Sequence, residues 1–204
     1  MPTKTPDVRP ARERLLAAAN ELFYEEGVHT VGIDRVIERA GVAKATLYST
    51  FGSKDELIRA YLHRRHVIRR ERISAALERY SSPRERLLGV FDVLGESFAE
   101  PGFHGCAFLN ASAEAQPGSS IIEVTDEYRG WVRMAFTDLA RAAGVNDPDT
   151  LARALHLLYD GAGVSARMDH DLGAAASARA VAAVLVDAAI AASGVITGTG
   201  TITG

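Results

Sequence analysis

Residues 41–57 read GVAKATLYSTFGSKDEL, and this stretch predicts a short helix, from Ala43 to Phe51, between two glycines. Helical periodicity places Leu47 and Phe51 on an inward face. The other face gathers an ammonium, a phenol and small hydroxyl groups, from Lys44, Thr46, Tyr48, Ser49 and Thr50. A helix that only fills a core does not need so many polar groups within two turns. The stretch therefore predicts a helix that presents a polar surface to a partner.

A second short helix precedes this one. Its apolar stripe begins at Ile33 and ends at Ala40, and Gly41 stops it. Two short helices joined through a glycine form the helix-turn-helix layout, in which the second helix enters the major groove of DNA. A longer helix before them, with an apolar stripe from Leu15 to Phe23, completes a three-helix unit. The alternative is that the three helices pack together with no role in DNA binding.

The rest of the chain also follows the helical period, and no segment alternates at period two. Three capping boxes, Ser53–Glu56, Ser82–Glu85 and Ser120–Glu123, mark the predicted starts of helices. Asp147 opens a later helix, and we expect Asp169 or Asp171 to open the last one. The chain is therefore predicted to be all-α, with about nine helices.

The net charge of −3 is distributed unevenly along the 204 residues. Residues 1–80 hold 15 Lys and Arg against 11 Asp and Glu, a net charge of +4, whereas residues 81–204 have a net charge of −7. A basic first third on an acidic remainder indicates that only the first third meets a polyanion such as DNA. The alternative is that the basic excess is the solvated face of one helix.

The composition also bears on the compartment and on cofactors. The single Cys106 excludes an internal disulfide and indicates a reducing compartment. Residues 1–14 do not fit a signal peptide, and the closest approach to a run of about 20 apolar residues, Ala174 to Ala192, is interrupted by charges. We therefore expect a cytoplasmic protein with no membrane partner. His63 and His66 have no acidic or Cys partner beside them, so we expect no metal site and no cofactor.

The segment GIDRVIERAGVAKATLYSTFGSKDELIRAYL, from Gly32 to Leu62, resembles the TetR family of bacterial transcriptional regulators. It contains the motif AGV.K.TLY..F.SKDEL almost complete. The motif resemblance covers about the first quarter of the chain, and the remainder resembles that family in its all-helical architecture only. The resemblance implies a helix-turn-helix DNA-binding domain over residues 10–52 and a ligand-binding and dimerisation domain over 53–193. The uncharged, low-complexity composition of residues 194–204 predicts a frayed tail.

The resemblance also implies which residues touch DNA. Lys44, Thr46 and Tyr48 fall on positions that contact DNA in the family, and Ser49 falls on one that varies with the operator sequence. Tyr48 and Lys54 correspond to ligands of the phosphate backbone. The predicted DNA-binding set is Thr30, Lys44, Ala45, Thr46, Tyr48, Ser49 and Lys54.

Two positions depart from the family pattern. Gly32 and Ala43 stand where a hydroxyl-bearing residue often caps the two short helices. Glycine costs little as a cap, but both changes remove a hydroxyl that could bind phosphate. Thr30 is the candidate replacement.

The segment from Phe103 to Glu114 concentrates polar groups within an apolar run, and it contains His104, Cys106 and Asn110 as candidates for a ligand pocket. The alternative is that these three are structural: a small buried thiol, a turn cap and a side chain bonded to backbone. A Cys–His pair here lacks a third orienting group, so we do not expect an enzyme. The predicted pocket set is Phe91, Phe98, Phe103, His104, Asn110, Tyr128, Trp131, Met134, His156 and Tyr159. Cations are few in these segments, so we expect an apolar or aromatic effector.

The last two helices are predicted to form a dimer interface. Small residues in LLYDGAGVSARM (157–168) allow another helix to approach closely, and the final helix repeats apolar residues near heptad spacing. The predicted interface set is Gly161, Ala162, Val181, Leu185 and Ala188. The alternative is an Ala-rich packing face within one chain.

Together these features predict a ligand-responsive DNA-binding transcriptional regulator. We expect a homodimer whose two recognition helices read a palindromic operator in double-stranded DNA. We also expect a repressor that a small-molecule effector releases from that operator. The alternative is a helical small-molecule binding protein or enzyme whose N-terminal three-helix unit is purely structural.

Overall fold

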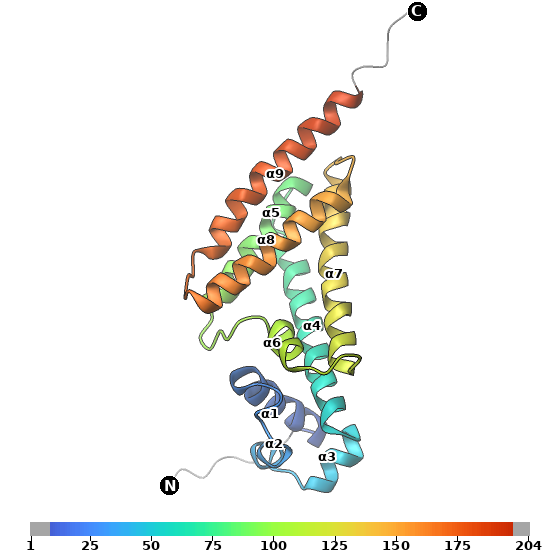
Figure 1. Cartoon of the computed structure of the whole chain (residues 1–204), viewed down its shortest axis with the longest axis vertical. Helices are drawn as coiled ribbons and strands as arrows, with labels where there is room; N and C mark the ends of the chain where they lie inside the picture. The colour runs from blue at the N-terminus through green and yellow to red at the C-terminus, as the bar shows by residue number, and fades with distance from the viewer. Residues whose placement is uncertain (1–8, 198–204) are drawn as a thin grey trace, which may run out of the picture. The chain divides into compact units, whose positions relative to one another are not determined.

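The computed structural model describes residues 9–197, and within them the chain forms nine α-helices and no strand (Figure 1). The helices are α1 (Ala11–Glu26), α2 (Ile33–Ala40), α3 (Lys44–Phe51), α4 (Lys54–Leu77), α5 (Pro83–Phe98), α6 (Ala107–Glu114), α7 (Ser120–Ala142), α8 (Pro148–Met168) and α9 (Ala174–Thr197). The predicted all-α fold is confirmed. Of the predicted tail, residues 194–197 complete α9, and residues 198–204 lie outside the described residues.

Glycines and polar caps bound the helices largely as the sequence predicts. Gly41 follows α2 in the left-handed conformation, with φ 62°, and its N–H donates to the carbonyls of Glu38 and Ile37. Left-handed backbone favours glycine because it has no Cβ, which is why the turn into α3 stands at this residue. Ser82 caps α5 in a complete capping box with Glu85.

The start of α9 differs from the prediction. The helix begins at Ala174, whereas Asp171 lies in the preceding turn and accepts a hydrogen bond from the Gly173 N–H at 2.8 Å. Asp169 is the C-terminal cap of α8. Both aspartates therefore serve the turn between α8 and α9 rather than the first turn of α9.

The helices form two compact units. The first unit contains the chain up to Val67 together with Ala107–Asp126, and the second contains Ile68–Cys106 and the chain from Glu127 onward. Thus α6, which the sequence assigns to the ligand-binding domain, packs with the first unit. The functional boundaries at residues 52 and 193 stay a prediction.

The first unit is built on the apolar face of α1, which packs against α2 and α3. Its fully buried side chains come from every helix of the three-helix unit and from the start of α4: Leu15, Ala19, Val36, Leu47, Leu57 and Leu62. Phe23 of α1 meets Tyr61 of α4 edge to face, with ring centroids 5.7 Å apart. Each of these Leu or Val side chains contributes about 1.5–3 kcal/mol when it leaves water.

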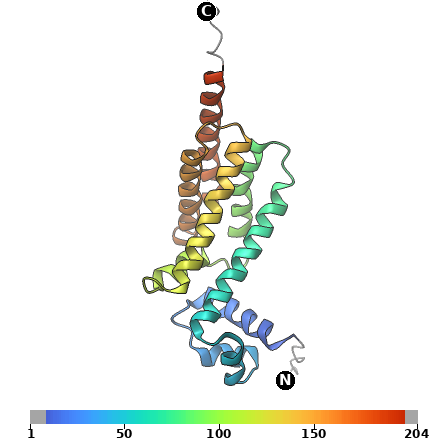
Figure 2. The same ribbon diagram turned by 90° about the vertical axis from the view of Figure 1, so that its right-hand side faces the viewer.

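In the second unit, α5, α8 and α9 pack on one another (Figures 1 and 2). Phe91 of α5 and Phe136 of α7 are buried completely, and their ring centroids are 5.9 Å apart. The inward face of α9 begins with small residues, Ala175, Ala178 and Ala182, and the Ala175 Cβ lies 3.3 Å from the position of a Cβ added at Gly95 of α5.

By length and composition alone, the stretch Ala174–Gly194 of α9 is apolar enough to cross a membrane. A packing helix of a water-soluble bundle passes the same test, so this single helix is weak evidence for a membrane. The absence of a membrane partner stays a prediction.

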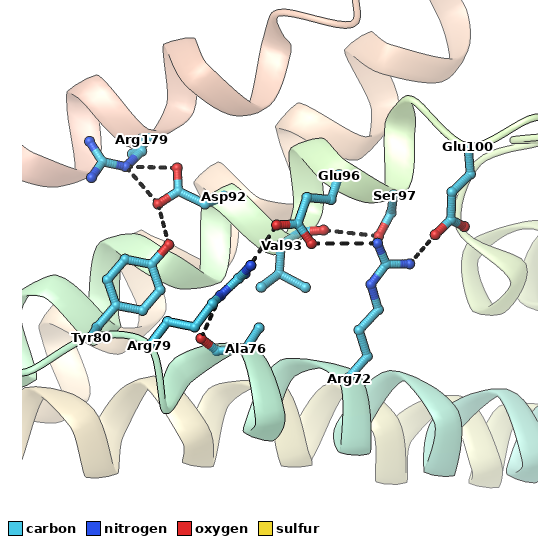
Figure 3. Close-up of polar contacts among 10 residues, drawn as sticks. All are labelled: Arg72, Ala76, Arg79, Tyr80, Asp92, Val93, Glu96, Ser97, Glu100 and Arg179. Carbon is cyan, nitrogen blue, oxygen red and sulfur yellow. Dashed lines mark hydrogen bonds and ion pairs between the residues drawn. The ribbon is translucent and has the colours of Figure 1, made fainter.

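A row of ion pairs joins the end of α4 and the turn after it to the end of α5 and the turn after it (Figure 3). Arg79 Nη2 lies 3.0 Å from Glu96 Oε1, and Arg72 pairs with both Glu96 and Glu100. These charges are partly exposed, so each pair contributes little by itself, but together they define which faces of α4 and α5 meet.

Tyr80, which follows α4, connects this region to α5 and α9. Its hydroxyl donates to Asp92 Oδ2 at 2.9 Å, and Asp92 also pairs with Arg179 of α9 at 3.0 Å (Figure 3). The Tyr80 ring lies directly on Gly89, where an added Cβ would come within 2.5 Å of it. Gly89 therefore makes room for the contact that links α4, α5 and α9.

Candidate nucleic-acid interface

The helix α3 is anchored on one side and open on the other. Leu47 is 0% exposed and fixes the inner face of α3 in the first unit. Phe51 is half-buried, and the Arg12 guanidinium lies over its ring, 5.5 Å from the centroid. The predicted inward positions are therefore inward in the structure, which leaves the remaining face of α3 for a partner.

The turn between α2 and α3 is held by Arg14 of α1. Its Nη1 donates to the carbonyl oxygens of Ala40 and Gly41, at 3.2 and 3.1 Å. A helix C-terminus leaves its last carbonyls unpaired, so a guanidinium there both satisfies them and opposes the negative end of the helix dipole. The sequence analysis missed Arg14, because the partners are 26 and 27 residues away.

Helix α2 is also tied to α1 by two ion pairs. Arg35 bonds Glu26 at 2.5 Å, and Arg39 bonds Glu21 at 2.7 Å. Each pair uses one cation and one anion, so the net charge of the first third is unchanged. These two arginines are nevertheless engaged within the unit.

The first residue of α3, Lys44, is exposed and pairs with Asp34 of α2 at 3.0 Å. The hydrogen bond to Asp34 raises the pKa of the Lys44 ammonium. A phosphate or a base edge that binds Lys44 must therefore compete with this carboxylate.

The predicted contact residues of α3 form one polar surface. Tyr48 is 46% exposed, so its ring is accessible on this surface. The hydroxyls of Ser49 and Thr50 both donate to the Thr46 carbonyl, at 3.1 and 2.6 Å, which orients them within the helix. Ala45 and Ser49 are exposed, whereas the side chain of Thr46 is half-buried.

Two further candidates lie beside α3. Thr30 is exposed in the turn between α1 and α2. The N-cap of α2 is Gly32, and no side chain caps that helix through a hydrogen bond. Lys54 is in the first turn of α4, and its Nζ lies 3.5 Å from the carbonyl of His29 in that same turn between α1 and α2. Burial lowers the pKa of the Lys54 ammonium, while the charges of Asp55 and Glu114 oppose this shift.

The pocket candidates separate into different environments. Asn110 lies in α6 with the first unit, and the other nine lie in the second unit. Most of these nine are core residues; for example, Tyr128 OH and Tyr159 OH lie 3.2 Å apart in the interior. Met134 does not join them, because it points to solvent and is 57% exposed.

One small cavity lies among these candidates. A cavity of about 10 Å³ is lined by Trp131 and Tyr159 together with five apolar neighbours. A larger groove of about 320 Å³ lies elsewhere, between the start of α8 and the C-terminal part of α9. The structure therefore brings two of the predicted aromatic residues, Trp131 and Tyr159, together around one small cavity.

The residues predicted for the dimer interface fall on two faces of α8 and α9. Gly161, Val181, Leu185 and Ala188 are exposed, but Ala162 is 5% exposed and packs inside its own chain. The exposed face is wider than the sequence predicts, because α8 adds Leu157, Val164 and Met168 and α9 adds Val184.

Among residues 9–197, no three His, Cys, Asp or Glu side chains form a group that could hold a metal ion.

Comparison with known sequences gives consistent matches. A sequence model of the family described as "Bacterial regulatory proteins, tetR family" matches residues 15–61. The chain is 50% identical over 56 residues to the HTH-type transcriptional activator FasR of Mycolicibacterium smegmatis, which spans 28% of this chain and 25% of FasR. It is 29% identical over 182 residues to the transcriptional regulator AcuR of Cereibacter sphaeroides, which spans 82% of this chain and 81% of AcuR. The chain thus spans a quarter of FasR but most of AcuR.

Solved structures match over nearly the whole chain. A TetR-family transcriptional regulator from Streptomyces coelicolor is 33% identical, with a TM-score of 0.77 over 90% of this chain and 95% of that one. A TetR transcriptional regulator from Chloroflexus aurantiacus shares the fold at 24% identity, with a TM-score of 0.77. These relatives are transcriptional regulators and not enzymes.

Proposed function

Since this chain belongs to the TetR family of bacterial transcriptional regulators, we propose that it represses transcription from a palindromic operator. It does so as a homodimer and leaves the operator when a small-molecule effector binds. The observation that carries the proposal is the division of α3 into a completely buried Leu47 and an exposed polar face with Lys44, Tyr48 and Ser49. This is the arrangement that a recognition helix needs in a major groove.

The two kinds of DNA contact divide among the residues. Lys54 and the Tyr48 phenol bind phosphates, which position the protein but carry no base information. Ser49 and Lys44 reach base edges, where a hydroxyl or an ammonium distinguishes donor and acceptor patterns. The anchoring of the turn by Arg14 supports this assignment, because it holds α3 in one orientation.

The homodimer rests on the exposed apolar face of α8 and α9. Leu157 and Met168 on α8 are each 73% exposed, and Val184 on α9 is 68% exposed. Exposed apolar residues that share one face of two neighbouring helices are typical of a surface that is covered in the assembly. A two-fold dimer presents two copies of α3, and this is what a palindrome requires.

The effector binds in the second unit, among the aromatic residues around Trp131. Binding there favours a conformation of the dimer with lower operator affinity, and the coupling free energy is the difference in effector affinity between the two states. Since Trp131 is the single tryptophan, its fluorescence is a direct probe. We expect an apolar or aromatic compound that shifts this fluorescence to release DNA, and a thermal-shift screen supplies the candidates.

Repression, rather than activation, is proposed because occupation of a promoter by DNA binding alone blocks transcription. The name of FasR describes an activator, but the match to FasR covers only a quarter of it, within the DNA-binding segment. That segment determines which DNA is bound, and the position of the operator relative to the promoter determines whether transcription is repressed or activated. The protein acts in the cytoplasm, where its DNA is.

The test begins with duplexes that the wild-type protein selects from a random-sequence pool. We expect an inverted repeat whose half-sites lie in successive major grooves, about one helical turn apart. A reporter with this repeat placed over its promoter should fall in expression when the protein is made. Failure to enrich any sequence contradicts the DNA-binding proposal, and a rise in expression contradicts repression.

A further inference from the structure

Glu114, the last residue of α6, reaches into the turn between α1 and α2. Its Oε2 accepts a hydrogen bond from the His29 N–H at 2.8 Å, although the two residues are 85 positions apart. The carboxylate also lies against Gly27, whose φ is +96° and where an added Cβ would be 2.9 Å from Oε1. The turn therefore leaves room for this carboxylate and offers it a donor.

His29, in the turn between α1 and α2, also contacts Lys54. While the His29 N–H donates to Glu114, the His29 carbonyl accepts from Lys54 Nζ at 3.5 Å. One peptide segment thus stands between the carboxylate of α6 and the ammonium of α4. All three groups belong to the first unit.

We propose that Glu114 is a positioning residue for DNA binding: by holding the His29 backbone it sets the place of the Lys54 ammonium that meets a phosphate. The proposal rests on the proposed function, in which Lys54 is a phosphate ligand. It also assigns a role to α6, whose sequence lies within the segment predicted to be the ligand-binding domain. That segment therefore contributes a contact to the DNA-binding unit itself.

Two effects of Glu114 on DNA binding have opposite signs. As a negative charge near the DNA-facing surface it repels phosphates, so its removal alone tightens binding. As an anchor of His29 it places Lys54, so the loss of the anchor weakens binding. Variants that change the charge and the length of the side chain separately therefore distinguish repulsion of phosphates from anchoring of His29.

Three substitutions at position 114 make this separation. Glu114→Asp keeps the charge but is one methylene shorter, Glu114→Gln keeps the reach and an acceptor oxygen but loses the charge, and Glu114→Ala loses both. We expect Asp and Ala to weaken affinity for the selected duplex about three- to tenfold, the range of one hydrogen bond. We expect Gln to bind as well as wild type or more tightly. Repulsion alone predicts the reverse order, with Asp unchanged and Ala tighter.

A double-mutant cycle tests whether Glu114 acts through Lys54. In a Lys54→Ala background, Glu114→Ala should change DNA affinity by less than about twofold, because the ammonium that it positions is gone. The matched control is Glu123→Gln, which removes an exposed carboxylate from the first turn of α7 in the same unit. This control should show only the effect of removing a negative surface charge.

The outcomes are distinguishable. If the wild-type protein selects no duplex, the proposed function fails before any variant is made. If it selects one but the cycle is additive, or if Glu114→Asp binds as wild type does, the role of Glu114 fails alone. Melting temperatures identify any variant that does not fold, and the Asp and Gln variants keep the test decisive if Ala unfolds.

Discussion

At the residue scale, Lys54 combines charge, partial burial and position. It stands in the first turn of α4, where free N–H groups of the helix also favour an anion. The His29 carbonyl holds its ammonium, so less side-chain freedom remains to be lost when a phosphate binds. A single cation placed in this way can contribute to affinity without contributing to sequence preference.

We predict that Lys54→Ala weakens binding to specific and unrelated duplexes by nearly the same factor. The slope of log affinity against log salt should flatten by about one, because one phosphate contact is lost. Fluorescence anisotropy at several salt concentrations measures both. The control is Arg59→Ala, which removes an exposed cation that pairs with Glu56 one turn further along α4. An unchanged slope for Lys54→Ala argues against the phosphate contact.

The pH dependence of stability is predicted to depend on His156. Burial lowers the pKa of its imidazole in the folded state, Asp160 opposes this shift, and Arg129 and Arg133 add to it. Because the folded pKa is below the unfolded value, the unfolded chain binds the proton first, so stability is full above the unfolded pKa of about 6.5. Stability is then lost as pH falls from there toward the folded pKa.

Denaturant unfolding of wild type and His156→Gln between pH 7.5 and 5 checks this prediction. The variant should lose less stability over that window than wild type does, since its side chain does not titrate. His63→Gln, at an exposed histidine of α4, should follow wild type. Parallel curves for wild type and His156→Gln contradict the assignment.

At the element scale, the corner of α4, α5 and α9 depends on shape as much as on charge. Tyr80 can reach Asp92 only because its ring lies on Gly89, and Asp92 in turn holds Arg179 of α9 (Figure 3). A glycine inside a helix normally lowers helix stability. Here the close approach of a ring explains why it stands there.

We predict that Gly89→Ala lowers the free energy of unfolding by about 1–3 kcal/mol, because the new methyl displaces the Tyr80 ring and its hydrogen bond. Gly130→Ala on α7 is the matched control, since its Cβ would meet its nearest neighbour only at 4.0 Å. That substitution should stabilise by up to about 1 kcal/mol through helix propensity. Adding Tyr80→Ala should remove most of the penalty of Gly89→Ala. A stabilised Gly89→Ala would contradict the packing argument.

At the scale of the whole molecule, the exposed face of α8 and α9 is expected to join two chains. The residues that the chain itself buries on these helices, such as Ala162 and Ala182, lie on the opposite sides. The exposed face carries large apolar side chains: Leu157, Val164, Met168, Val181 and Val184. Both operator symmetry and affinity should therefore depend on this surface.

We predict that Val184→Glu gives monomers at micromolar concentration, because the dimer would bury an unpaired carboxylate. Light scattering measures the mass, and the variant should also lose affinity for the palindromic duplex. Met134→Glu is the control, at another exposed apolar residue, on α7. It should remain dimeric. Monomeric wild-type protein would refute the proposed interface.

The sequence by itself determined the local features of this protein. Helix positions follow from spacing, and their ends follow from Gly41, Gly52 and the Ser82–Glu85 box, because propensity and capping act within a few residues. The inward face of α3, with Leu47 and Phe51, is local for the same reason. The helix-turn-helix arrangement could therefore be predicted from about twenty consecutive residues.

Only the tertiary structure decided the contacts between distant segments. Arg14 on the α2–α3 turn, Glu114 on the α1–α2 turn and Asp34 on Lys44 join residues that no periodicity relates. Likewise the rotation of each helix placed Met134 outside and Ala162 inside, against the prediction. A helix turns by 100° per residue, so an error of one position moves a side chain from core to surface. Packing between helices fixes that rotation, and packing depends on the whole chain at once.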